Sequence, residues 1–224
     1  MHGIAYDDVQ DLIMVPAQLS QAILAFRGAA QGEEPPLRVI QGPHTEIRQA
    51  DRVTVDAVHK EMFVMDAGQV LVFPADANGD VAPIRAIRGP DTQLNDAGGI
   101  PPIAVDPVNN VIVVAARSIL IFDRMANGNA KPLRVISGSG AGGGRLAAAH
   151  DGLIFAASRR ALGVWSIHDN GPVPPRWKIG EGVLQQMRAV AIDAKHKSVI
   201  ITDKELNAVL TYNVPEVFAQ ELPR

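Results

Sequence analysis

The stretch that decides the fold is residues 103–138, which read Ile103-Ala-Val-Asp-Pro-Val-Asn-Asn-Val-Ile-Val-Val-Ala-Ala-Arg-Ser-Ile-Leu-Ile-Phe-Asp-Arg-Met-Ala-Asn-Gly-Asn-Ala-Lys-Pro-Leu-Arg-Val-Ile-Ser-Gly138. The stretch holds short apolar segments rich in Val and Ile, separated by Asn-Asn, Arg-Ser and Asn-Gly turns. Such segments, bounded by turn residues and without helical spacing, predict β-strands. We therefore expect a unit of four strands, the last of which begins at Pro-Leu-Arg.

The same unit recurs along the whole chain of 224 residues. Copies of its first half occupy residues 4–15, 53–64, 146–156 and 190–201. Copies of its last strand begin at Pro36, Pro83 and Pro175. A repeat of this length indicates stacked supersecondary units, each of which buries its apolar faces against its neighbours.

The predicted fold class is all-β, a β-propeller of about five four-stranded antiparallel blades that forms a closed ring, an open arc or part of a six-bladed ring. We expect one domain over residues 1–224, with blade units at about 3–47, 53–94, 103–146, 147–187 and 190–224. The last unit ends in Ala208-Val-Leu-Thr-Tyr-Asn213 without a Pro-x-Arg strand. An open arc would expose two sheet edges, and unpaired edges invite pairing with another chain.

The repeat resembles the NHL-type family of β-propellers. Gly3-Ile-Ala-Tyr-Asp7, Ile103-Ala-Val-Asp106 and Ile119-Leu-Ile-Phe-Asp123 carry the likeness, which extends over nearly the whole chain. The chain departs from the family where the usual Asp-x-Gly-Asn-Asn link is cut to Ala67-Gly-Gln69 or Arg117-Ser118. The resemblance implies a propeller scaffold, and because bacterial proteins with such units are often exported, it implies a periplasmic or extracellular location. No signal peptide precedes the first strand-like segment.

Composition limits the classes of function. The net charge is −3, and no apolar run approaches the length of a membrane helix, so we expect neither nucleic-acid binding nor membrane insertion. Residues 1–112 carry 7 basic and 15 acidic side chains (−8), and residues 113–224 carry 14 and 9 (+5). These opposite charges suggest head-to-tail self-association. The chain has no cysteine, which excludes disulfides and thiolate chemistry.

Two apparent ligand motifs have structural explanations. An Asp ends most of the first strands, and Asp before a tight turn usually accepts hydrogen bonds from backbone N–H groups rather than binding a metal. The glycines of Gly138-Ser-Gly-Ala-Gly-Gly-Gly-Arg145 match G-x-G-x-x-G, but a strand follows them instead of the helix that a dinucleotide site needs. We expect no metal and no cofactor.

The segments that link one unit to the next are the candidate binding surface. They vary while the strands repeat, and polar residues on loops of a rigid frame are typical of binding sites. The candidate residues are His44, Arg48, Asp91, Gln93, Asp96, Arg145 and Arg188. The alternative is that they are merely solvated linkers.

No catalytic motif is present, and we expect no catalytic residue. The leading hypothesis is therefore a non-catalytic scaffold that binds a protein partner, or itself, through its loop face or an exposed blade edge. The alternative is a metal-dependent lactonase or lyase, because propeller enzymes gather single ligands from distant blades without a local motif. Nucleic-acid binding through the arginines of the basic half ranks last, since few stacking aromatics accompany them.

Overall fold

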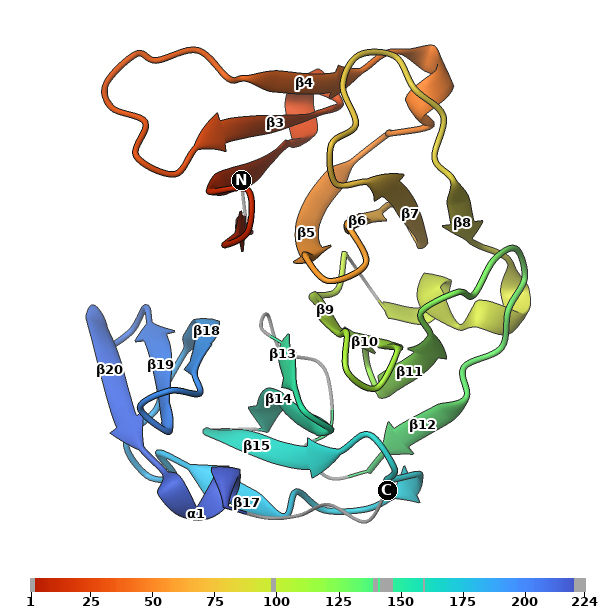
Figure 1. Cartoon of the computed structure of the whole chain (residues 1–224). Coiled ribbons are helices and arrows are strands. Elements are labelled where there is room, and N and C mark those ends of the chain that lie inside the picture. Colours follow the sequence, from red (N-terminus) through yellow and green to blue (C-terminus); the bar gives the residue numbers. More distant parts are fainter. Residues whose placement is uncertain (1–2, 98–99, 139–140, 142–146, 159, 220–224) are drawn as a thin grey trace. The chain divides into compact units, whose positions relative to one another are not determined.

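The computed structural model describes residues 3–97, 100–138, 141, 147–158 and 160–219, and almost all of its regular structure is β (Figure 1). The strands form five sheets, as the repeat predicts, and confirm the all-β, β-propeller fold class. We call the sheets blades 1 to 5 in chain order. By their contacts the residues divide into two compact units, 1–103 with 124–131, and 104–123 with 132–224.

The first compact unit contains blades 1 and 2, in which consecutive strands pair antiparallel. Blade 1 comprises β1 (Ala5–Asp7), β2 (Leu12–Ala17), β3 (Ala22–Arg27) and β4 (Arg38–Gln41). Blade 2 comprises β5 (Ala50–Asp56), β6 (Glu61–Asp66), β7 (Gln69–Pro74) and β8 (Arg85–Ile87). Short 3-10 turns follow strands at η1 (Gln18–Ser20), η2 (Pro43–Thr45), η3 (Pro90–Thr92) and η4 (Leu94–Ala97).

The second compact unit contains blades 4 and 5 and nearly all of blade 3. Blade 3 comprises β9 (Ile103–Asp106), β10 (Val111–Ala115), β11 (Ile119–Asp123) and β12 (Arg134–Ser137), extended by the two-residue β16 (Gly171–Pro172). Blade 4 comprises β13 (Ala147–His150), β14 (Leu153–Ser158), β15 (Ala161–Ser166) and β17 (Trp177–Ile179). Blade 5 has three strands, β18 (Met187–Asp193), β19 (Ser198–Asp203) and β20 (Ala208–Asn213), followed by the short helix α1 (Pro215–Phe218).

Apolar side chains from neighbouring blades share a core within each unit. In the first unit, Ile23 of blade 1 and Phe73 of blade 2 belong to one buried cluster. In the second unit, Trp165 of blade 4 packs in a cluster with Val113 of blade 3, and Phe155 packs in another with Val199 of blade 5. The middle strands of blades 2, 3 and 4 are therefore covered on both faces, and all five residues of β10 are buried. This explains why the middle strands are continuous apolar runs without alternation.

An Asn-Gly turn in one blade fastens the outermost strand of the preceding blade, a device that we call the clip. In the first example, the Asn78 Oδ1 accepts the Val39 N–H at 2.9 Å, and the Gly79 N–H donates to the Val39 carbonyl at 2.7 Å. Gly79 lies parallel to Ile40 as an isolated bridge. The clip therefore adds a one-residue strand to an edge that would otherwise be unpaired.

Two further clips repeat this geometry. Asn127 Oδ1 accepts the Ala86 N–H at 3.1 Å, and Gly128 lies parallel to Ile87. Asn170 Oδ1 accepts the Val135 N–H at 3.0 Å, and here the clip is long enough to form the parallel strand β16. The second clip also explains why residues 124–131 belong to the first compact unit, since they are bound to β8. The sequence predicted only turns at these Asn-Gly pairs.

Candidate functional site

The first two linkers between blades begin with the same structure. Each reads Gly-Pro-x-Thr, at Gly42–Thr45 and Gly89–Thr92, and each folds into a 3-10 turn. The buried Thr hydroxyl donates to the carbonyl of the preceding Gly at 2.7 Å in both. In these two linkers the expected variation therefore holds only for the later parts, because their first halves share one structural element.

His44 and Asp91, two of the predicted site residues, occupy equivalent positions in these turns. The His44 N–H donates to Asp80 Oδ1 at 2.8 Å, and the Asp91 N–H donates to Asn129 Oδ1 at 2.8 Å. His44 Nδ1 also lies 2.7 Å from Asp80 Oδ2, and this hydrogen bond is the main reason why the pKa of Asp80 lies below its ordinary value. Both backbones are tied to the residue that follows the Asn-Gly of a clip, while both side chains are exposed.

The remaining predicted residues lie in several parts of the chain. Arg48 and Gln93 have exposed side chains in the first unit, and the Arg48 N–H donates to Asp66 Oδ1 at 3.0 Å. Arg188 belongs to the second unit, where its guanidinium donates to Gln186 Oε1 at 2.8 Å. Asp96 lies in η4 without a described side chain, and Arg145 lies outside the described residues. A shared binding surface for the seven residues stays a sequence-based prediction.

The carboxylates that end the first strands cap the turns that follow them. Each carboxylate accepts the N–H of the residue three positions later with one oxygen and bonds that residue's side chain with the other. The pairs are Asp7–Gln10, Asp56–His59, Asp106–Asn109 and Asp193–His196. Within the described part of the chain, no group of three or more His, Cys, Asp or Glu side chains could hold a metal ion. The structural interpretation of these Asp residues is confirmed.

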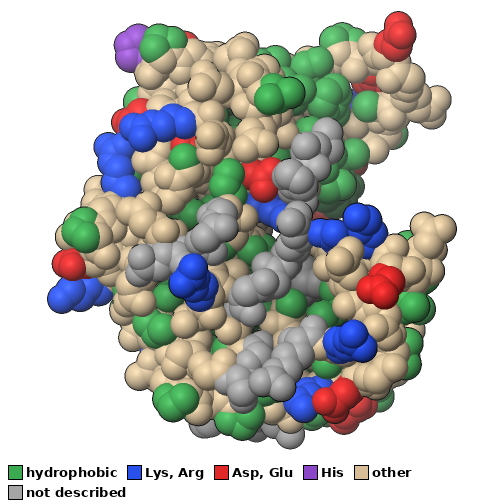
Figure 2. All heavy atoms as spheres, turned by 180° about the vertical axis from the view of Figure 1, so that it is seen from behind, with side chains coloured by type: hydrophobic (Ala, Val, Ile, Leu, Met, Phe, Trp, Pro, Cys, Tyr) green, Lys and Arg blue, Asp and Glu red, His purple; other side chains and the backbone are tan. Residues whose placement is uncertain are grey.

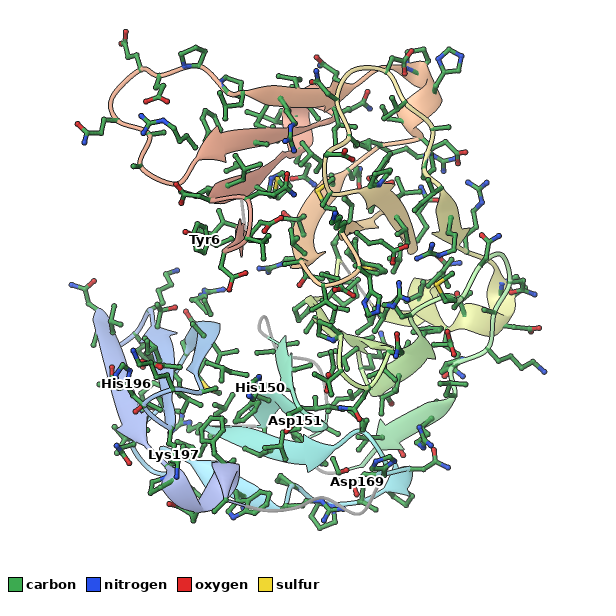
Figure 3. The ribbon with its side chains drawn as sticks, viewed as in Figure 1. Tyr6, His150, Asp151, Asp169, His196 and Lys197 are labelled. Carbon is green, nitrogen blue, oxygen red and sulfur yellow. The ribbon has the colours of Figure 1, made fainter. Side chains whose placement is uncertain are left out.

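Two histidines of the second unit make structural contacts. His196 lies in the turn between β18 and β19, where its Nδ1 is 2.7 Å from Asp193 Oδ2 (Figure 3). His150 ends β13, and its ring meets that of Phe218 in α1 edge-on at 6.2 Å (Figure 3). Phe218 also stacks on Phe155 at 6.1 Å. Both histidines therefore serve packing and turn formation in the second unit.

A buried ion network joins blade 2 to its clip. Glu61, at the start of β6, accepts two hydrogen bonds from the Arg85 guanidinium at 2.8 Å each, and Arg124 Nη1 donates to it at 2.5 Å. Burial raises the pKa of Glu61, but the two guanidiniums outweigh burial and hold it below its ordinary value. Leu12 stands at the equivalent place in blade 1, so the network is specific to blade 2. It fixes the loop that carries the second clip.

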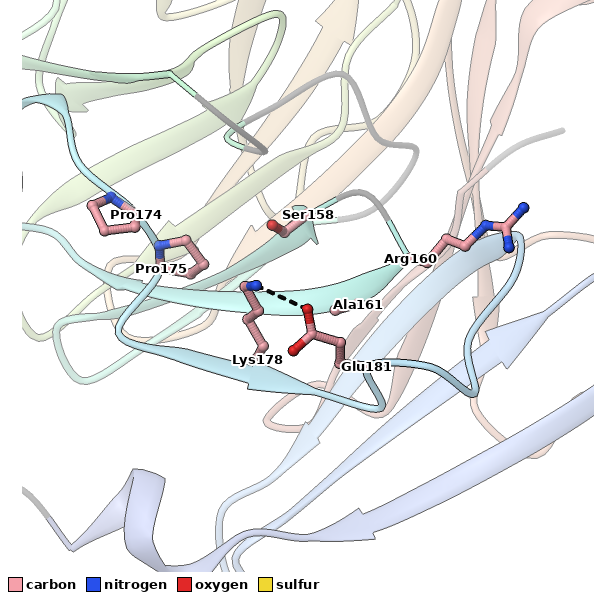
Figure 4. A pocket seen from close by; sticks show the side chains of 7 residues that line it. All are labelled: Ser158, Arg160, Ala161, Pro174, Pro175, Lys178 and Glu181. Carbon is pink, nitrogen blue, oxygen red and sulfur yellow. Dashed lines mark hydrogen bonds and ion pairs between the residues drawn. The ribbon is translucent and has the colours of Figure 1, made fainter.

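One pocket lies in blade 4 (Figure 4). It has a volume of about 570 Å³ and is lined by Ser158, Arg160, Ala161, Pro174, Pro175, Lys178 and Glu181. The charges on Lys178 and Glu181 neutralise each other in an exposed ion pair of 2.8 Å. No ligand chemistry follows from this lining.

In the described residues, blade 5 presents an open strand edge at β20. In the described chain β20 pairs with β19 and with no strand on its other side, whereas β3, β7, β11 and β15 each pair with a fourth strand. The Val214 N–H donates to the Lys197 carbonyl at 2.9 Å, which makes these residues a hydrogen-bonded pair. Because such pairs alternate along an antiparallel ladder, the backbone groups of Val209, Thr211 and Asn213 point away from β19.

The face of blade 5 next to this edge is also exposed. Thr211 pairs with Ile200, which pairs with Ala191, so these side chains share one face; Thr211 and Ala191 are exposed and Ile200 is half-buried. Val209 is 68% exposed, although it is an apolar residue within a strand. The chain turns away after β20, since Val217 of α1 is buried among residues of blades 4 and 5. The edge and face of β20 thus form a candidate binding surface.

Charged side chains are dispersed on the one face that Figure 2 shows. On the face shown in Figure 2, Lys and Arg side chains stand in small separate groups among hydrophobic and uncharged ones. No helix in the described residues is long and apolar enough to cross a membrane.

Comparison with known proteins identifies a shared fold. No protein-family model matches the chain, and no curated protein sequence matches it. Among solved structures, the chain is similar to Kuenenia stuttgartiensis hydrazine synthase, with a TM-score of 0.64 and 17% identity. The match covers 90% of this chain and 55% of that one, so the chain spans about half of its neighbour's length. At this identity the likeness establishes the fold and no activity.

Proposed function

We propose that this protein is a non-catalytic propeller scaffold that binds a protein partner through the open edge of blade 5. The observation that carries the proposal is the outward-pointing backbone of Val209, Thr211 and Asn213, beside exposed side chains. An unpaired strand edge binds extended segments by continuing the sheet, with backbone hydrogen bonds for affinity and alternate side chains for specificity. An NHL-like repeat, inferred from the residues quoted above, is part of the proposal.

The edge is a better candidate than the linker loops. The first halves of the linkers at Gly42–Thr45 and Gly89–Thr92 make the same internal bonds, and their N–H groups at His44 and Asp91 are already paired. The edge of β20, by contrast, offers a row of backbone donors and acceptors that need a partner. No cluster of described residues favours the metal-dependent lactonase or lyase, which stays a sequence-based hypothesis.

A strand supplied in trans tests the proposal. The probe is a synthetic peptide with the sequence of residues 132–138, Pro-Leu-Arg-Val-Ile-Ser-Gly, since this segment contains β12 and pairs with β11 in blade 3. Amide exchange followed by NMR should show the Thr211 N–H exchanging fast in the free protein and more slowly with peptide. Unchanged exchange at Val209, Thr211 and Asn213 at millimolar peptide would refute the proposal.

A matched pair of variants separates edge binding from other effects. Thr211→Pro removes an outward N–H that β19 does not use, and Pro is tolerated on edge strands in that orientation, so the protein should fold but the peptide should no longer slow amide exchange at Val209 and Asn213. Thr211→Val keeps the N–H, and the peptide should slow exchange at these two amides as in the wild type. Equal slowing at Val209 and Asn213 in both variants would show that the peptide does not pair with this edge.

A further inference from the structure

The turn between β3 and β4 of blade 1 has the form of a clip, but no strand among the described residues pairs with it. Gln31-Gly32 stands at the place in this turn that Asn78-Gly79, Asn127-Gly128 and Asn170-Gly171 occupy in the next three blades. In each case the Gly is left-handed, with φ of +59° at Gly32 against +79°, +64° and +81° in the others. The turn also starts with the same hydrogen bond, from Ala30 N–H to the Arg27 carbonyl at 2.9 Å, as from Ala77 to Pro74 at 3.1 Å.

The empty clip is held in shape by its own ion pair. Arg27 donates to both carboxylate oxygens of Glu34, at 3.0 and 2.7 Å, and the Gln31 N–H donates to Glu34 Oε2 at 3.4 Å. Arg176 and Asp169 brace the occupied clip of blade 4 in the same way, at 3.2 and 2.5 Å. Among described residues, the Gln31 side chain has no hydrogen-bond partner. Figure 1 shows this loop extending beyond the end of its own sheet.

The face of blade 1 beside the clip is apolar and partly exposed. Tyr6 pairs with Ile13, which pairs with Phe26, so the three side chains share one face of the sheet. Tyr6 is 58% exposed, and Ile13 and Phe26 are half-buried. On the other face of blade 1, Met14 and Ile23 are buried against blade 2. A strand held by the clip would therefore lie beside an apolar surface that lacks a cover.

The three occupied clips define what the fourth would bind. The strands that they hold read Arg38-Val-Ile-Gln41, Arg85-Ala-Ile-Arg88 and Arg134-Val-Ile-Ser137. In each of them the clip amide accepts the N–H of the residue after Arg, and the clip Gly lies parallel to the Ile. The recognised feature is thus an extended segment with Arg, a small apolar residue, Ile and a polar residue in succession.

We propose that Gln31-Gly32 is a second binding site, which takes an extended segment of this Arg–Val/Ala–Ile–polar class from another polypeptide. Gln31 Oε1 accepts the N–H of the residue after Arg, and the Gly32 N–H donates to the carbonyl of the same residue. Gln is one methylene longer than the Asn of the other clips, so Gln31→Asn should bind such a segment more tightly. This site lies on blade 1 and does not depend on the edge of β20.

Amide exchange by NMR tests the site with internal controls. In the free protein we expect fast exchange at Gly32 and slow exchange at Gly79 and Gly128, whose N–H groups donate at 2.7 and 2.8 Å. Peptide 132–138 should slow exchange at Gly32 and leave the other two unchanged. Replacing Ile by Asp in the peptide should abolish the effect. The Gly32 amide reports on the clip of blade 1, and the Thr211 amide reports on the edge of β20. A negative result at one amide therefore leaves the proposal for the other site testable.

Variants of the clip complete the test. Gln31→Leu removes the acceptor and should weaken peptide binding about fivefold, the effect of losing one ordinary hydrogen bond. Ala29→Ser, an exposed change in the same turn, should leave binding unchanged. Equal effects of the native and Asp peptides at Gly32, or no effect at millimolar peptide, would overturn the proposal. Protection of Gly32 that rises with protein concentration alone would overturn it in favour of a second copy.

Discussion

Replacing Glu61 by Gln should strongly destabilise the protein, because it leaves two guanidiniums partly buried without their shared carboxylate. The side chains of Glu61, Arg85 and Arg124 are each only 11% exposed, and the carboxylate bonds both arginines at 2.5 to 2.8 Å. Removing one member of a buried ion pair typically costs about 3–5 kcal/mol. For a chain of this length the midpoint of thermal unfolding should fall by about 6–10 °C.

The effect should depend on pH in a defined direction. The pKa of Glu61 is lowered in the folded state, so the network stabilises the protein above the ordinary Glu pKa of about 4.3 and loses this effect as pH falls through the folded value. Gln does not titrate. The difference in unfolding free energy between wild type and Glu61→Gln should therefore be full at pH 7 and shrink progressively below about pH 4.

Chemical denaturation at several pH values measures this difference directly. Glu46→Gln is the matched control, because the ion pair of Glu46 with Arg88 has side chains that are 37% and 49% exposed and should contribute less than about 1 kcal/mol. The reasoning would be refuted if Glu61→Gln unfolded within about 1 kcal/mol of the wild type at pH 7. A difference that stayed constant into strong acid would refute it as well.

Two further changes probe the repeat itself. Gly89→Ala should destabilise blade 2 by about 1–3 kcal/mol, because Gly89 has a φ of +127° and a Cβ there would collide with Asn129. In a double-mutant cycle, adding Asn129→Ala should recover the part of the loss that is due to the collision. Additive effects of the two substitutions on the free energy of unfolding would contradict this explanation. Burial raises the pKa of Asp203, but hydrogen bonds from the N–H groups of Gln185, Leu206, Gln186 and Glu205 outweigh burial and lower this pKa. Asp203→Asn should therefore reduce stability at pH 7, and its effect should shrink as pH falls below about 4. Equal denaturation midpoints of the variant and the wild type at pH 7 would count against the role of these hydrogen bonds.

Features that every unit repeats could be predicted from the sequence. Alternation of Val and Ile with turn residues predicted the strands, and turn chemistry predicted that Asp56 and its equivalents are caps. These inferences worked because they depend on residues close together in the chain.

Features that depend on distant partners were missed. Asn78 looks like any turn residue, yet its side chain bonds Val39, 39 positions earlier in the chain. Glu61 breaks the repeat, since blade 1 has Leu12 in its place, and such a departure could have marked the ion network. The Gly-Pro-x-Thr of two linkers is visible in the sequence and could have shown that His44 and Asp91 sit in built turns. The sequence alone could not predict which of the candidate site residues lie close together in space.

The clips all run in one direction along the chain, from a later blade to an earlier one. Damage at the two ends of the chain should therefore have unequal consequences. Shortening from the carboxyl side removes the clip that holds the outermost strand of the blade that becomes last. That strand should then fray, and the fraying can extend to the strands before it. Shortening from the amino side removes only the strand that the clip of the new first blade had held. The blades that follow keep all the hydrogen bonds of their own clips.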